Sequence, residues 1–338
     1  MNHPLPPAPF PLTEEGNLLL DVKNLIAQLR NGTRIVDDIS FAIRAGETFA
    51  LLGESGCGKS MTALSLLRLL PDGVVHAGGT AQLDGVELFG LREREMCGVR
   101  GGTAAMIFQE PALSLNPVLT VGQQIAEALA LHQGLRGAAA QQRCAELLAQ
   151  VGIPDAARRV AEYPFQFSGG MKQRAMIAMA LAGQPKLLIA DEPTTALDVT
   201  IQAQVLQLLR DTQEASGMSL LLITHGLGVV AEMAHRVGVM YAGQIVEQAS
   251  RAQLFAKPLH PYTKNYLQRC PVRCGATSRW PPFRAACRRW AASRRGAVLR
   301  RAATARGRCA ANKRPDGRCL RKGEGYDAIC MEELRSEG

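Results

Sequence analysis

The sequence predicts an α/β protein with a central parallel sheet. Short apolar runs typical of buried strands cover residues 49–53, 104–109, 186–191, 219–224 and 237–241. Segments with helical periodicity separate these runs. Strands that alternate with helices are typical of a parallel sheet whose crossover connections are helical.

Between the second and third strands the pattern changes to helices. Apolar residues recur at helical spacing through 121–131 and 142–151, and no comparable strand pattern lies between Pro111 and Phe167. We therefore expect a helical subdomain, about residues 111–183, inserted into the α/β core.

The region before the first buried strand has a different pattern. Residues 18–46 alternate as antiparallel strands, with Asn31-Gly32 as a turn signal, so they predict an N-terminal antiparallel β subdomain. Residues 1–16 carry five prolines and two glutamates and lack the basic start and apolar run of a secretory signal, so we expect a disordered N-terminus. No apolar run approaches the roughly 18 residues of a membrane span, and we expect a cytoplasmic protein.

The net charge of +9 is unevenly distributed along the 338 residues. Residues 270–338 hold 17 of the 39 basic and 6 of the 30 acidic residues, which gives +11 there and −2 elsewhere. The body of the chain is therefore not basic, and we expect no nucleic-acid partner. The three cysteines before residue 270 are scattered, which is typical of a reducing compartment.

The basic tail, 270–338, also holds six of the nine cysteines. Clustered arginines could meet lipid head groups or an acidic partner. A metal or iron–sulfur site is a second reading, although no two of these cysteines have C-x-x-C spacing. The third interpretation, a poorly ordered or frame-disturbed end, is the one we prefer.

One segment matches a phosphate-binding loop. The pattern G-x-x-x-x-G-K-[ST] runs through Gly53-Glu54-Ser55-Gly56-Cys57-Gly58-Lys59-Ser60 and continues into a helical pattern that starts at Met61. Glycines let backbone N–H groups surround phosphate oxygens, the lysine adds a positive charge, and the serine hydroxyl can bind Mg²⁺. We expect these eight residues and Met61 to bind a nucleotide.

Two further segments place polar groups at the ends of elements. The apolar strand 187–190 delivers Asp191 and Glu192 at its carboxyl end, where one acid can bind the metal and the other can polarise the attacking water. Ser168, followed by Gly169 and Gly170, precedes a helical pattern and is expected to cap it. Taken alone, the acid pair could equally be two acids that favour the N-terminus of the next helix. A serine at such a position is more often an ordinary helix N-cap without a ligand.

Together these motifs resemble the nucleotide-binding subunit of ATP-binding-cassette (ABC) transporters, a P-loop NTPase fold. The resemblance covers about residues 17–268 and also includes the segments around Gln109, Asp198 and His225. It implies an ABC ATPase domain over 17–250 and a family-type C-terminal extension over 251–269.

The resemblance also implies roles for individual residues. Ser60, Gln109 and Asp191 would organise Mg²⁺, while Glu192 would act as the general base and His225 would contact the γ-phosphate of ATP. The Ser168 signature would contact ATP held by an opposing subunit, so two ATP molecules would lie between two ATPase subunits, and Asp198 would lie in the loop that joins the two ATP sites. Without the resemblance, His225 and Gln109 would be ordinary packed or loop residues.

A narrower likeness points to the dipeptide and oligopeptide importer branch, which also includes nickel and glutathione importers. It rests on four further segments, namely 114–122, 196–202, 240–243 and 260–263. The branch implies integral-membrane permease subunits, a second ABC ATPase subunit, identical or not, and indirectly a solute-binding protein. Such an assembly would place the chain at the cytoplasmic face of the bacterial inner membrane.

Two positions depart from the branch. No aromatic residue lies near Leu29, where one usually stacks on adenine, and Gly226 follows the histidine where aspartate is usual. The main alternative function is a soluble ABC-type ATPase in DNA repair or translation. Only about 58 residues and no sustained heptads separate Gln109 from Ser168, and the chain has one cassette, so we favour the importer. A non-hydrolysing relative would lack Glu192 or Lys59.

Overall fold

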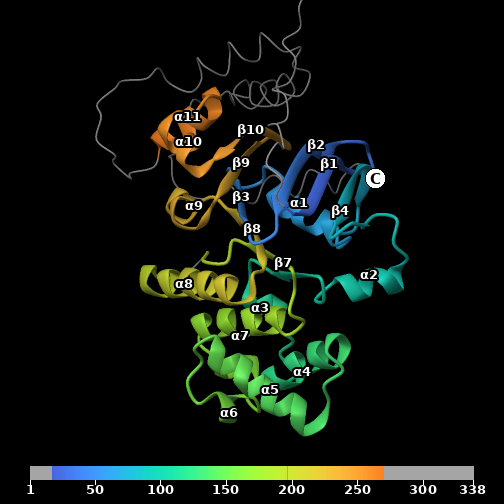
Figure 1. The fold of residues 1–338 in the computed structure, drawn as a ribbon, viewed down its shortest axis with the longest axis vertical. Coiled ribbons are helices and arrows are strands. Elements are labelled where there is room, and N and C mark those ends of the chain that lie inside the picture. Colours follow the sequence, from blue (N-terminus) through green and yellow to red (C-terminus); the bar gives the residue numbers. More distant parts are fainter. Residues whose placement is uncertain (1–16, 196, 270–338) are drawn as a thin grey trace, which may run out of the picture. The chain divides into compact units, whose positions relative to one another are not determined.

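The computed structural model describes residues 17–195 and 197–269, all within one unit of the chain, Met1–Gly275. Figure 1 shows two sheets with helices around them. The predictions for the N-terminus, 1–16, and for the tail, 270–338, lie outside the described residues. The predicted domain limits remain predictions.

The first sheet is antiparallel and has the strand order β2-β1-β4-β5. Its strands are β1 (Leu18–Leu29), β2 (Arg34–Arg44), β4 (Val74–Leu83) and β5 (Val86–Glu87). The predicted hairpin is confirmed: Gly32 has φ +83°, and the Asn31 side chain accepts a hydrogen bond from Thr33 N. The apolar pattern does not predict β4, because adjacent glycines interrupt it and most of its side chains are not buried.

The second sheet has the order β10-β9-β3-β8-β7-β6. It contains β3 (Thr48–Leu52), β6 (Ala104–Ile107), β7 (Leu187–Asp191), β8 (Ser219–Thr224), β9 (Arg236–Tyr241) and β10 (Gln244–Ser250). The five predicted strands are parallel, as expected, and most of their residues are buried. The sheet is mixed, however, because β10 pairs antiparallel with β9. Ala242 (φ +49°) and Gly243 (φ +84°) form the two-residue turn between them.

The predicted inserted helices are confirmed. Between β6 and β7 lie α3 (Pro111–Ser114), α4 (Val121–His132), α5 (Gly137–Gln150), α6 (Ala156–Arg159), the 3-10 turn η1 (Pro164–Gln166) and α7 (Gly169–Leu181). Helix α4 starts with a capping box, in which Thr120 accepts from Gln123 N and Gln123 accepts from Thr120 N. Val121, Ile125 and Leu129, on one face of α4, are buried. These helices form the lower part of Figure 1.

The remaining helices connect strands or follow the second sheet. They are α1 (Lys59–Leu66), α2 (Glu93–Val99), α8 (Val199–Ser216), α9 (Leu227–Met233), α10 (Arg251–Ala256) and α11 (Pro261–Gln268). None of the described helices is both long and apolar enough to cross a membrane.

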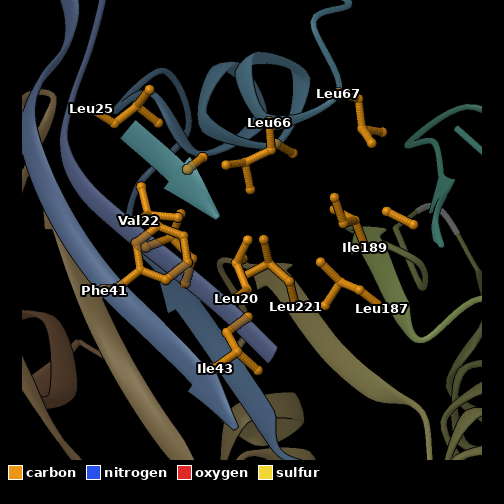
Figure 2. Packing of buried hydrophobic residues seen from close by; sticks show 14 of the residues in the cluster. Leu20, Val22, Leu25, Phe41, Ile43, Leu66, Leu67, Leu187, Ile189 and Leu221 are labelled. Carbon is orange, nitrogen blue, oxygen red and sulfur yellow. The ribbon is translucent and has the colours of Figure 1, made fainter. Parts of the chain in front are cut away.

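The core joins the two sheets around α1. Figure 2 shows Leu20, Val22 and Phe41 of the antiparallel sheet near Leu221 of β8 and Leu66 of α1. All five side chains are at most 4% exposed. Burial of this apolar surface fixes α1 against both sheets, and with the helix the loop that precedes it.

Candidate active site

The predicted phosphate loop connects β3 to α1. Backbone geometry explains two of its glycines: a Cβ on Gly53 would lie 2.4 Å from the Met240 carbonyl oxygen, and Gly58 has φ +105°. Lys59 Nζ donates to the carbonyl oxygens of Gly53 (2.9 Å) and Glu54 (3.0 Å), so the lysine folds back over its own loop. The loop is thus a closed turn with a buried lysine.

The turn between β9 and β10 packs against this loop and hydrogen-bonds to it. Gly243 N donates to the Cys57 carbonyl oxygen at 3.0 Å, and Asp37 N donates to the Gly243 carbonyl oxygen at 2.8 Å. The Cys57 side chain is buried, and burial raises the pKa of its thiol despite the nearby Lys59. Cys57 therefore packs inside the loop as a small apolar residue.

Asp191 and Glu192 lie at the carboxyl end of β7, two strands from β3. Asp191 is 4% exposed, and its Oδ1 atom is buried without a hydrogen-bond partner among the described residues. Burial raises the pKa of Asp191, and repulsion by Glu192 adds to this effect, whereas the Ser60 hydroxyl and Lys59 oppose it. An unpaired buried carboxylate oxygen beside a serine hydroxyl suits a hard cation.

Glu192 is the centre of a small hydrogen-bond network. Its Oε1 lies 2.9 Å from His225 Nδ1, and its Oε2 accepts from Thr195 Oγ1 at 2.8 Å and from Gln109 Nε2 at 3.5 Å. Burial alone would raise the pKa of Glu192, but hydrogen bonds from His225 and Thr195, together with the charges of His225 and Lys59, leave the pKa below its ordinary value. Sequence reasoning missed Thr195 as a contact of Glu192.

A cavity of about 300 Å³ brings eight of the seventeen predicted residues together; Asp191 and His225 are not among the described residues that line it. It is lined by Ser55, Gly56, Gly58, Lys59, Ser60 and Met61, with Gln109, Glu192 and Ile35. Ile35 of β2 was not predicted, and no sequence signal identifies it because its place depends on strand register. Leu29, the expected position beside adenine, is not among the described residues that line this cavity.

The signature residues and Asp198 lie elsewhere on the chain. Ser168 caps α7 by accepting from Met171 N at 3.4 Å, and Asp198 caps α8 by accepting from Ile201 N at 2.9 Å. Gly170 faces Ile201, so the two helix starts are adjacent. Ser168, Gly169 and Asp198 are exposed, and none of them is among the described residues that line the cavity.

A second, larger cavity contains none of the predicted residues. It has a volume of about 580 Å³ and lies between the start of β1, helix α5 and the end of α8. Its charged residues include Lys186 and Asp84, which form an ion pair with each other at 2.5 Å. The smaller cavity, with its phosphate loop and acids, is therefore the candidate active site.

Comparisons with known proteins agree with this geometry. Residues 36–195 match the ABC transporter family. A peptide import ATP-binding protein of Brucella abortus is 52% identical over 256 residues, which cover 75% of this chain and 77% of the relative. The oligopeptide transport ATP-binding protein AppD of Bacillus subtilis is 51% identical over 258 residues, which cover 75% of this chain and 79% of AppD.

Solved structures show the same fold. A dimeric ATP-binding cassette, in a post-hydrolysis state with ADP and phosphate, superposes with a TM-score of 0.62 at 25% identity over 69% of this chain and 99% of that one. CbiO1 of Clostridium perfringens, part of an ABC transporter complex, superposes with a TM-score of 0.62 at 25% identity. The match covers 75% of this chain and 96% of CbiO1. The predicted ABC nucleotide-binding fold is thereby confirmed, and the chain belongs to the ABC transporter family as one of its ATP-hydrolysing, ATP-binding proteins.

Proposed function

We propose that this ATPase energises the import of dipeptides, oligopeptides or a related solute across a bacterial inner membrane. The observation that carries the proposal is the identity of 51–52% to peptide import and oligopeptide transport proteins, over about three quarters of each chain. The geometry of the candidate active site supports the ATP-dependent part of this function.

ATP and Mg²⁺ fit the residues of the cavity. Backbone N–H groups of the phosphate loop and the charge of Lys59 would bind the phosphates, and Ile35 offers an apolar contact for the base. Ser60, Asp191 and Gln109 supply a hydroxyl, a carboxylate and an amide, the oxygen donors that Mg²⁺ prefers. The unpaired Oδ1 of Asp191 supports this assignment. Bound Mg²⁺ would neutralise charge on the phosphates.

Glu192 would act as the general base. Its lowered pKa keeps the carboxylate ionised at neutral pH, so that it can take a proton from an attacking water. His225 would orient Glu192 and contact the γ-phosphate. Gln109, in the loop after β6, would contact Glu192 and the metal ion. The closeness of all three side chains supports these roles.

The exposed signature supports a head-to-tail pair of ATPase subunits. Ser168, Gly169 and Gly170 start a helix whose N-terminal N–H groups can bind an anion. Since they do not line the chain's own cavity, the ATP they address would be held by a second subunit. Asp198 caps the adjacent α8 and would lie between the two ATP sites. The second subunit can be identical or a related ATPase.

Integral-membrane permease subunits would dock beside the Gln109 loop. Leu113 is 80% exposed and Val118 is 75% exposed, and both follow Gln109 within ten residues. Large apolar side chains at such exposure favour a protein contact. We place the chain at the cytoplasmic face of the membrane, with a solute-binding protein acting through the permease. A role in DNA repair or translation is not favoured.

Co-purification and transport test this function. A tagged full-length chain should bring permease subunits out of solubilised membranes, and the reconstituted assembly should hydrolyse ATP faster when a peptide-loaded binding protein is added. Replacing both Leu113 and Val118 by serine should abolish co-purification while leaving ATP binding intact. ATP-dependent binding to DNA or ribosomes instead of a permease would overturn the proposal.

A further inference from the structure

Helix α11 is firmly anchored, although the proposed function gives it no role. Both carboxylate oxygens of Glu247, which is 8% exposed, accept backbone hydrogen bonds just before the helix, from Leu259 N and His260 N at 2.8 Å each. His260 Nδ1 then caps the helix by accepting from Tyr262 N at 3.2 Å. Thr263 is 1% exposed. A buried anchor of this kind holds α11 in one place.

One face of α11 reaches the phosphate loop. The Tyr262 hydroxyl accepts from Glu54 N at 3.4 Å, and Arg269 Nη1 forms an ion pair with Glu54 Oε1 at 3.0 Å. The Tyr262 ring packs against Tyr241 of β9, with ring centroids 4.4 Å apart. The loop is therefore held at Glu54 through both its backbone and its side chain.

The same face reaches the histidine of the active site. The Tyr266 hydroxyl donates to the backbone carbonyl oxygen of His225 at 2.6 Å. His225 in turn contacts Glu192 through its ring. Tyr262 and Tyr266 are four residues apart and lie on one side of the helix, and Arg269 continues this side as the C-cap residue. A single helix face thus contacts both the phosphate loop and His225.

We propose that α11 is a positioning element of the ATP site, in which Tyr262 and Arg269 set the phosphate loop and Tyr266 sets His225. This inference rests on the proposed ATPase function. Catalysis depends on groups held in place before the reaction, because a displaced group must be reordered at each turnover. Loss of the Tyr266 contact should therefore affect the chemical step, and loss of the Glu54 contacts should affect ATP binding.

Kinetics of the full-length chain separate the two contacts. Tyr266→Phe keeps the ring and should lower kcat about five-fold with little change in the KM for ATP. Tyr262→Phe and Arg269→Ala should raise that KM by about two- to five-fold with a smaller change in kcat. Tyr163→Phe, a matched loss of a hydroxyl in the helical subdomain, should match the unsubstituted chain. Kinetics unchanged in all three α11 variants would overturn the inference.

A double-substitution cycle tests whether Tyr266 acts through His225. In a His225→Ala background, Tyr266→Phe should cause no further loss of kcat. An equal loss in both backgrounds would show a general structural effect and overturn the assignment.

NMR gives a readout that does not need turnover. The ring resonances of His225, assigned by their absence in His225→Ala, should shift in Tyr266→Phe and stay fixed in Tyr163→Phe. Unshifted resonances would refute the contact. If the unsubstituted chain neither binds nor hydrolyses ATP, the proposed function fails, whereas the NMR result still decides whether Tyr266 positions His225.

Discussion

The two surfaces to which we assign ATP binding differ in how they are built. The cavity surface, made of the phosphate loop and Glu192 with Asp191 next to it, has its lysine and both acids buried and is held by contacts from both sheets. The signature surface, made of Ser168, Gly169, Gly170 and Asp198, lies mainly exposed at the starts of α7 and α8. The cavity surface can bind ATP with residues of one chain. The exposed helix starts do not face this cavity, so they would contact ATP that another chain holds. The difference favours a site shared between two subunits.

The largest effect should come from Glu192→Gln in the cavity surface. Removing the base should lower kcat by about 10²- to 10⁴-fold while ATP still binds, because the amide keeps the shape but cannot take a proton. Steady-state hydrolysis checks the first part, and sedimentation with ATP should show an accumulated dimer. Turnover at the unsubstituted rate would contradict the role of Glu192.

Lys59→Ala in the cavity surface should weaken ATP binding. Loss of a charged donor to phosphate weakens ATP binding by about 10- to 100-fold, as expected from 1.5–3 kcal/mol per charge-assisted hydrogen bond. Titration with a fluorescent ATP analogue measures this change. Lys172→Ala, which removes a lysine from α7, serves as a comparison for loss of charge alone, and equal affinities in the two variants would contradict the prediction.

Gly169→Asp should disrupt ATP contact at the signature surface and leave the cavity surface unchanged. Its added Cβ meets no atom within 4 Å, and a negative charge at a helix start is compatible with the fold. The carboxylate would repel ATP held by a second subunit, so hydrolysis should fall about ten-fold or more while binding to the cavity stays near normal. Gly98→Asp, at an equally open position in α2, is the control. Unchanged hydrolysis would argue against a shared site.

The smallest effect is expected from Gly226→Asp. Gly226 follows His225, whose ring contacts Glu192 of the cavity surface. Gly226 precedes α9 with φ −88° and gives the helix no side-chain cap. Aspartate fits this conformation and can accept from a free N–H, so the melting temperature should rise by about 1 °C, since a glycine cap is only a few tenths of a kcal/mol worse. A fall in melting temperature would show that the glycine is needed there.

The difference between the two surfaces also explains what sequence alone could predict. The phosphate loop and the acid pair each lie in one short segment next to a strong apolar strand, so local patterns identify them. Ile35 carries no such pattern, because it reaches the cavity through the tertiary packing of β2. Thr195 lies only three residues after Glu192, but the pattern does not show that its hydroxyl turns back to that carboxylate. Strand β4 was missed for a related reason: it is stabilised by pairing with β1, while its own residues alternate poorly.

The contact between Glu54 and Tyr262 joins residues 208 positions apart. During synthesis the phosphate loop therefore leaves the ribosome long before the helix that contacts it. Contacts so distant in sequence form late and slowly. A nascent chain would hold nucleotide only loosely until α11 emerges, which delays ATP hydrolysis until that stage of synthesis.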